Sequence, residues 1–252
     1  MPAEHGGWGF LLEPVVLGLI LAPSASGWCI GGAALAAFLV RHPLKLALMD
    51  RRRGAWYPRT GLAVRFALGY AGGALLLAGA AWGLARAPFW PALVLGAPAG
   101  LVALGYDARG RSREALPEAA GAVALGASVS AIALAGGLPS GVAYGAWALL
   151  ALRAIPAVLF VRARLRLDRG LPAGVSLALG SHVVAVAGGV TLAAAGWGPW
   201  LGVLALALLL GRAAQGLSSR RAKLRPKDLG FREMGWGLVT LALLAVGYRL
   251  GL

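Results

Sequence analysis

Residues 141–170 read GVAYGAWALLALRAIPAVLFVRARLRLDRG, and this stretch decides the class of fold. Residues 141–161 are apolar apart from Arg153, and residues 162–169, which follow at once, hold four arginines and one aspartate. About 20 apolar residues suffice for a helix to cross the hydrocarbon core of a bilayer. Short loops rich in Lys and Arg stay on the cytoplasmic side. The stretch therefore predicts a transmembrane helix that ends at the cytoplasmic surface.

The rest of the chain repeats this pattern of an apolar run followed by a turn. We predict transmembrane helices at residues 7–23, 27–48, 61–84, 88–105, 117–136, 141–161, 172–195, 199–214 and 233–251. Basic clusters lie at every second junction, at residues 41–59, 107–113, 162–169 and 220–232. The other junctions carry no charge except Arg86.

This alternation predicts an all-α fold, a polytopic membrane helical bundle of about nine transmembrane helices. No hydrophilic stretch is long enough for a separate soluble domain, so we expect a single transmembrane domain over residues 1–252. Because basic loops stay inside, the N-terminus is expected in the cytoplasm and the C-terminus outside.

The composition supports a membrane protein and argues against nucleic-acid binding. Hydrophobic residues make up 59% of the chain, charged residues 13%, and the mean hydropathy is +0.76, which is too apolar for an ordinary soluble domain. The net charge of +15 would favour a nucleic-acid partner in a soluble protein. Here the charge lies in loops beside the membrane, where topology and anionic lipid headgroups account for it. We therefore expect no nucleic-acid partner.

Among the ionisable residues within the predicted spans, we single out Glu13, Arg153 and His182. An ionisable group in a membrane is energetically expensive, so it either has a partner or serves a function. Glu13 and Arg153 therefore have two interpretations, a structural ion pair or the lining of a polar cavity, and the second is favoured. For His182 a hydrogen-bonded packing role is favoured, and the three histidines of the chain form no metal-ligand pattern.

Arginine clusters at two predicted loops, at residues 41–60 and 162–170. If the sixth helix continues into its loop, Arg162 and Arg166 share one face at i and i+4. Like charges on one face destabilise an isolated helix, and an anion between them would relieve that cost. Guanidinium groups bind phosphate in a bidentate manner without a metal. The alternative interpretation is a solvated loop that carries only the topology signal.

Three segments resemble the YwiC-like family of bacterial integral membrane proteins. They are residues 4–14 (EHGGWGFLLEP), 41–45 (RHPLK) and 162–167 (RARLRL). The resemblance covers essentially the whole chain and implies a multi-pass protein of the bacterial inner (cytoplasmic) membrane. It implies no particular activity.

At a greater distance the layout resembles the UbiA-type intramembrane prenyltransferases, which are nine-helix bundles with polar motifs on the cytoplasmic side. Their second helix ends in an N-D-x-x-D-x-x-x-D motif that an Arg follows nine residues later. Asp50 and Arg59 match the last Asp and that Arg, whereas the other motif positions hold His42, Pro43 and Leu46. Tyr106 lies in the counterpart of a further loop of that family.

A second departure from the UbiA pattern affects the metal site. The D-x-x-x-D motif at the end of the sixth helix, aligned on Gly170, falls on Arg162 and Arg166. Paired aspartates hold the Mg²⁺ that helps a diphosphate to leave. Their replacement argues against Mg²⁺-dependent prenyl transfer by this chain, so we expect no metal and no cofactor. Whether the protein is an enzyme stays open, and no catalytic residue is predicted.

The first hypothesis is a protein that binds, and could modify, an anionic amphiphile in a cytoplasm-facing polar cavity. The ligand would be a membrane lipid or an isoprenoid-type molecule, such as an isoprenyl phosphate, a quinone precursor or a phospholipid. The predicted ligand-binding residues are Glu13, His42, Lys45, Asp50, Arg59, Tyr106, Arg153, Arg162 and Arg166. The alternatives are a small-anion transporter that uses Arg153 and His182, a divergent prenyltransferase, and a structural subunit. The sequence names no protein partner.

Overall fold

The computed structural model describes residues 5–252, and these residues form nine α-helices and no strand. The helices are α1 (His5–Leu21), α2 (Ala25–Arg52), α3 (Pro58–Leu84), α4 (Trp90–Ala108), α5 (Ala115–Ala135), α6 (Ser140–Asp168), α7 (Val175–Ala194), α8 (Trp200–Leu217) and α9 (Pro226–Leu250). In a bilayer every backbone N–H and C=O needs an internal partner, and a helix provides one within each apolar segment. The predicted all-α bundle is confirmed for the described residues.

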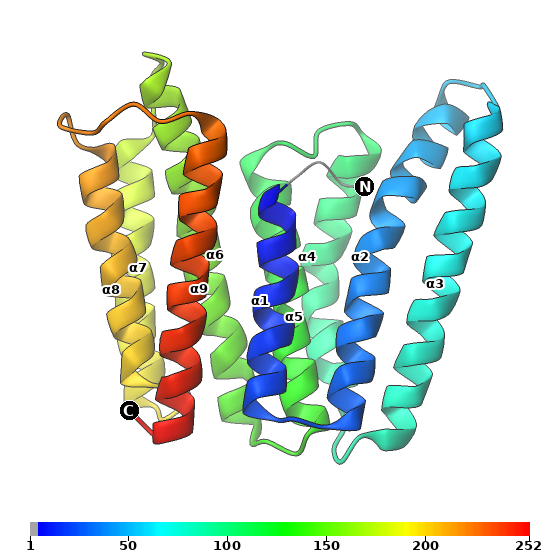
Figure 1. Cartoon of the computed structure of the whole chain (residues 1–252), viewed down its shortest axis with the longest axis horizontal. Coiled ribbons are helices and arrows are strands. Elements are labelled where there is room, and N and C mark those ends of the chain that lie inside the picture. The colour runs from blue at the N-terminus through cyan, green and yellow to red at the C-terminus, as the bar shows by residue number, and fades with distance from the viewer. Residues whose placement is uncertain (1–4) are drawn as a thin grey trace.

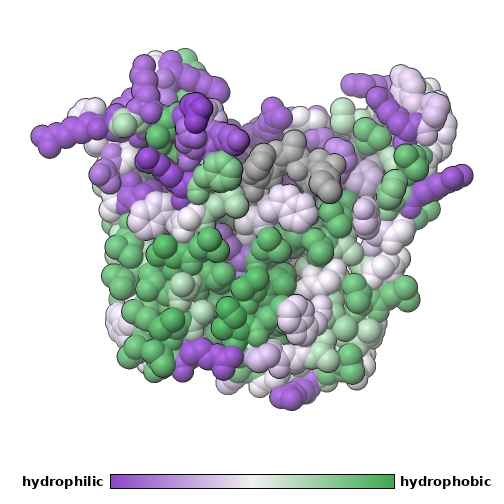
Figure 2. Space-filling view, viewed as in Figure 1, coloured by the Kyte–Doolittle hydropathy of each residue, from purple (hydrophilic) through white to green (hydrophobic). Residues whose placement is uncertain are grey.

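The helices run up and down beside one another, so alternate junctions gather at opposite ends of the bundle (Figure 1). The junctions α2–α3, α4–α5, α6–α7 and α8–α9 share one end, drawn at the top. Hydrophilic side chains concentrate at that end, which we call the charged end, above a broad apolar band (Figure 2). The junctions there are the basic clusters of the sequence.

The outer surface of the bundle is apolar, and its centre is built from small residues. Leu75 and Leu76 of α3 are 74% and 78% exposed, as expected for side chains that face lipid. Helix α5 lies at the centre, because every residue from Gly126 to Ala135 is buried and it packs against α1, α2, α4 and α6. Small side chains allow helices to approach closely where no hydrophobic effect drives their association.

Eight of the helices are long and apolar enough to cross a membrane, and α1 is the exception at 17 residues. Transmembrane helices range from about 17 to 25 residues, so α1 lies at the lower limit. It packs against α5 and α9 inside the bundle. Together these helices make the chain a multi-pass membrane protein.

The helix boundaries at the charged end differ from the prediction. The second helix was expected to end at residue 48 and the sixth at 161, but α2 continues to Arg52 and α6 to Asp168. Helix α9 begins at Pro226 rather than at residue 233. Arginine is a good helix former, and proline suits the first turn. Basic residues expected in loops therefore extend the helices beyond the apolar band.

The orientation of the bundle in the membrane stays a prediction, and cysteine labelling tests it. In a Cys29→Ala background, Ser140→Cys at the far end should react with an impermeant maleimide in intact cells. Ser219→Cys at the charged end should react only after permeabilisation, because basic loops are retained inside. Both positions are exposed, so access to the thiol is not limited by burial.

The reverse pattern, with Ser219→Cys labelled in intact cells and Ser140→Cys protected, would invert the topology. Labelling of both in intact cells would show that the two ends of the bundle are not separated by a membrane.

Candidate functional site

An ion pair lies in the middle of the bundle, between α1 and α6. Arg153 Nη1 is 2.6 Å from Glu13 Oε2, and the side chains are 6% and 11% exposed. Of the two interpretations of these residues, the structure therefore supports a structural ion pair directly. Removing one partner of a buried pair typically costs about 3–5 kcal/mol, because the other charge is left unpaired.

Helix α9 packs directly onto this ion pair through a glycine. A Cβ atom at Gly237 would lie 2.2 Å from Glu13 Oε1 and 2.6 Å from Arg153 Nη2. Only glycine lets the backbone of α9 come this close to the two charged side chains. The pair thus joins α1, α6 and α9.

A second buried ion pair lies one helical turn nearer the charged end. Arg212 Nη1 of α8 is 3.0 Å from Glu233 Oε1 of α9, with side chains 8% and 16% exposed. Arg153 is close enough to act electrostatically on both Arg212 and Glu233. The two pairs form a single row of alternating positive and negative side chains inside the bundle. We call this row the buried file (Glu13, Arg153, Glu233 and Arg212).

His182 lies beside the buried file and is 2% exposed. Its Nδ1 is 2.8 Å from the carbonyl oxygen of Ala178 one turn earlier, and its ring packs edge-on against Phe160. These contacts fit the packing role that the sequence favoured. The other ring nitrogen, Nε2, makes no hydrogen bond to the described residues.

The basic end of α6 turns its arginines toward two cavities. Residues two apart on a helix point about 200° apart, so Arg162 and Arg164 face opposite sides. Arg162 lines a cavity of about 300 Å³ between α1, α2, α5 and α6, which we call the Arg162 cavity. Its other lining residues include Phe10, Phe38, Arg41, Ser112, Arg113, Glu118 and Leu125.

Arg164 lines a cavity of about 370 Å³ between α6, α8 and α9, which we call the Arg212 cavity. Its other lining residues include Phe160, Arg212, Gln215, Arg220, Arg221, Leu229, Arg232, Glu233 and Trp236. Five arginines and one glutamate thus surround it, so the cavity is strongly positive.

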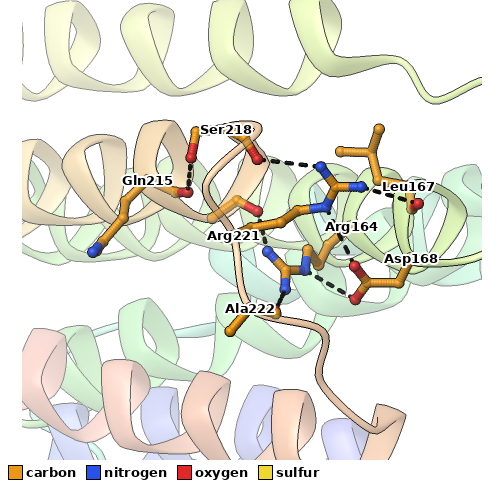
Figure 3. Close-up of polar contacts among 8 residues, drawn as sticks. Arg164, Leu167, Asp168, Gln215, Ser218, Arg221 and Ala222 are labelled. Atoms are coloured by element: carbon orange, nitrogen blue, oxygen red, sulfur yellow. Dashed lines mark hydrogen bonds and ion pairs between the residues drawn. The ribbon is translucent and has the colours of Figure 1, made fainter.

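One wall of the Arg212 cavity is a closed hydrogen-bond network (Figure 3). Arg164 donates to Asp168 and to the carbonyl oxygens of Gly216 and Ala222. Arg221 donates to Asp168 from the other side, and to the carbonyl oxygens of Ser218 and Leu167. Asp168 thus ties the end of α6 to the α8–α9 loop, and both of its oxygens are occupied.

Two of the predicted site residues, Asp50 and Arg59, close the α2–α3 junction. Asp50 is buried, and Arg59 donates to both of its carboxylate oxygens at 3.1 and 3.4 Å. The hydroxyl of Thr60 donates to Asp50 at 2.7 Å. These contacts give Asp50 and Arg59 a structural role, because they join the end of α2 to the start of α3. His42 is exposed on α2.

The remaining predicted residues divide between the Arg162 cavity and its surroundings. Lys45 donates to Ser112 at 2.9 Å, and Ser112 lines that cavity. Tyr106 lies under the guanidinium of Arg111, with 5.2 Å between the Arg111 Cζ and the ring centroid. Arg166 is exposed, donates to the carbonyl oxygen of Pro172, and does not line the cavity. The structure therefore brings Arg162 and Lys45 to one region and leaves Arg166 outside it.

Sequence reasoning missed Arg212, Glu233 and the buried Asp107, which binds Arg41 through two hydrogen bonds. Arg212 was expected to lie at the end of the eighth helix, and the other two at helix boundaries. The available signal was a single arginine in the run LALALLLGRAAQG at residues 204–216, where a charge needs a partner.

No cluster of three or more His, Cys, Asp or Glu side chains suited to a metal ion occurs within residues 5–252. Asp50 and Asp168, the carboxylates nearest the UbiA-type motifs, already bind arginine. The expected absence of a metal and of any cofactor stays a prediction.

The comparisons with known proteins identify the family. The sequence profile of the YwiC-like protein family matches residues 1–133, which is more than half of the 252 residues. The chain belongs to the YwiC-like family. The match covers α1 to most of α5, and thus Glu13 and one side of the Arg162 cavity. No curated protein and no solved structure matches the chain, so the resemblance to UbiA-type enzymes stays a prediction.

The close approach of α9 predicts that Gly237→Ala destabilises the protein. The added methyl group would displace Glu13 or Arg153, and overpacking of this kind costs about 1–3 kcal/mol. The measurement is the free energy of unfolding in mixed micelles with increasing SDS.

Gly235→Ala is the matched control, because its Cβ atom would meet nothing within 4 Å on the same helix. It should leave stability unchanged or raise it slightly, since alanine is the better helix former. Equal effects of the two substitutions would contradict the packing described here.

Proposed function

We propose that this YwiC-like protein binds an anionic amphiphile in the Arg162 cavity. The headgroup would meet the arginines of the cavity, and the chain would run between helices into the membrane. Isoprenyl phosphates, quinone precursors and phospholipids have this chemistry. The observation that carries the proposal is the amphipathic construction of the cavity, which combines guanidinium groups with aromatic and aliphatic side chains.

The polar part of the cavity is positive. Arg113 of the α4–α5 loop and Arg162 of α6 line it together with Arg41 of α2, which is paired with Asp107, and Glu118 is the one carboxylate among the lining residues. A guanidinium binds a phosphate or carboxylate directly and in a bidentate manner, so such a headgroup needs no metal.

Arg162 retains donors for a ligand. Its Nη1 donates to the carbonyl oxygen of Arg113 at 2.7 Å and lies 3.4 Å from Glu118. Both contacts use one nitrogen, so Nη2 and Nε have no bond to the described residues. The side chain is 38% exposed, which leaves it accessible from the charged end.

The apolar part of the cavity suits the start of a hydrocarbon chain. Phe10 of α1, Phe38 of α2 and Leu125 of α5 line it. A volume of about 300 Å³ holds a small headgroup and the first part of a chain but not a whole lipid. The rest of the chain would lie against the apolar outer surface.

Small-anion transport is the second candidate function, and the buried file is the observation that favours it. Alternating charges extend from Glu13 in the middle of the bundle to Arg212 near the charged end. His182, which the transporter hypothesis also uses, interacts electrostatically with Arg212. Phosphate uptake by proteoliposomes would favour transport over binding if the substitution His182→Phe abolished that uptake.

The amphiphile proposal predicts that Arg162→Gln weakens binding of phosphatidic acid. A charge-assisted bond to phosphate contributes about 1.5–3 kcal/mol, so the dissociation constant should rise by roughly tenfold or more. Native mass spectrometry of the protein in a neutral detergent, titrated with dioleoyl phosphatidic acid, gives the dissociation constant. Dioleoylglycerol, with the same chains and no charge, should bind much more weakly.

Arg169→Gln is the control variant, because it removes one exposed charge from the same end of α6 without altering the cavity lining. It should change the affinity little. If both variants weakened binding equally, attraction by the whole basic surface would explain the affinity and the proposal would fail.

A further inference from the structure

We propose that the Arg212 cavity is a second anion site and that it takes a phosphate group. This inference does not depend on the amphiphile proposal, because the two cavities lie on opposite sides of α6 and involve different arginines. Nothing in the family match reaches α8 or α9.

The central observation is the buried guanidinium of Arg212. The side chain is 8% exposed, and none of its three nitrogens makes a hydrogen bond to the described residues. Glu233 lies 3.0 Å from Nη1 but not in hydrogen-bonding geometry. Buried donors in proteins are nearly always satisfied, so this group calls for an acceptor that the protein itself does not supply.

Two features stabilise the charge of Arg212 without supplying that acceptor. Its Cζ lies 4.0 Å from the ring centroid of Phe160, in the geometry of a cation–π contact. The carboxylate of Glu233, 3.0 Å from Nη1, also stabilises the charge electrostatically. Neither feature occupies the N–H groups, which stay available to oxygen atoms in the cavity.

The rim of the cavity adds further donors. Arg220 and Arg232 are exposed there, and no hydrogen bond ties either one to another described residue. Hydrogen bonds from Arg164 and Arg221 to Asp168 fix the wall of the cavity between this rim and the buried Arg212. The site therefore combines the buried Arg212, two exposed arginines at the rim, and a wall that hydrogen bonds hold in place.

This arrangement matches a phosphate group better than a carboxylate. A phosphate carries up to two negative charges and several oxygens in a tetrahedral arrangement, so guanidinium groups from three directions can bind it together. The volume of about 370 Å³ also leaves room for a small organic substituent beside Leu229 and Trp236. The phosphate could arrive free, as a soluble monoester, or on a lipid headgroup.

The test is calorimetric titration of the full-length protein in a neutral detergent with inorganic phosphate. Wild type should show saturable binding. Arg232→Gln should weaken it by about tenfold, because one charge-assisted contact is lost. The double variant Arg212→Gln/Glu233→Gln removes the buried guanidinium without leaving a lone buried charge, and should abolish binding while the protein keeps its thermal unfolding transition.

Arg169→Gln is the control, because this exposed arginine lines neither cavity, and it should leave the phosphate affinity unchanged. Competition by phosphatidic acid, lost in Arg232→Gln, would identify a lipid as the source of the phosphate group, and its absence would identify a free phosphate or monoester. The proposal is overturned if wild type binds no phosphate, or if the folded double variant binds it as wild type does. Loss of phosphate binding in Arg162→Gln alone would also overturn it, since the anion would then occupy the other cavity.

Discussion

The structure depends on the ion pair between Glu13 and Arg153. Charges inside a membrane must be compensated, and here the compensation comes from helices far apart in sequence, α1 and α6. Helix α9 can pack on the pair only because residue 237 is glycine. The second pair, between α8 and α9, continues the arrangement toward the charged end. The buried file thus joins α1, near the N-terminus, and α8 and α9, near the C-terminus, to α6.

Charge pairing also separates structural arginines from candidate binding residues. The chain has 24 Lys and Arg against 9 Asp and Glu, so basic groups far outnumber the carboxylates with which they could pair. Asp50 and Asp168 are fully occupied by nearby arginines, which makes those arginines part of the scaffold. Arg162, Arg212, Arg220 and Arg232 line cavities and have donors left over, so they have capacity for an anion.

Much of the fold was predictable from sequence because membrane insertion imposes a strong one-dimensional pattern. Length and hydropathy located all nine helices of residues 5–252, and loop charge separated the two ends of the bundle. The helix ends were less predictable, since α6 and α9 continue past the apolar band into residues that carry charge. Hydropathy marks the edge of the lipid and not the end of a helix.

The candidate site was predictable only in part, because side-chain pairing is a three-dimensional property. The sequence singled out Glu13, Arg153 and Arg162, but it could not tell which of them are already paired. The i, i+4 spacing of Arg162 and Arg166 suggested a shared ligand, yet Arg166 lies outside the cavity and bonds to the following turn. The sequence did not single out Arg212 and Glu233, because they form an ion pair only through the contact between α8 and α9.

The most direct test of this account is a double-mutant cycle on Glu13 and Arg153. Free energies of unfolding in SDS mixed micelles would be compared for wild type, Glu13→Gln, Arg153→Met and the double variant. Each single variant should lose about 3–5 kcal/mol, and the double should lose less than the sum by at least about 2 kcal/mol. Losses that simply add would contradict the claim that this ion pair holds α1, α6 and α9 together.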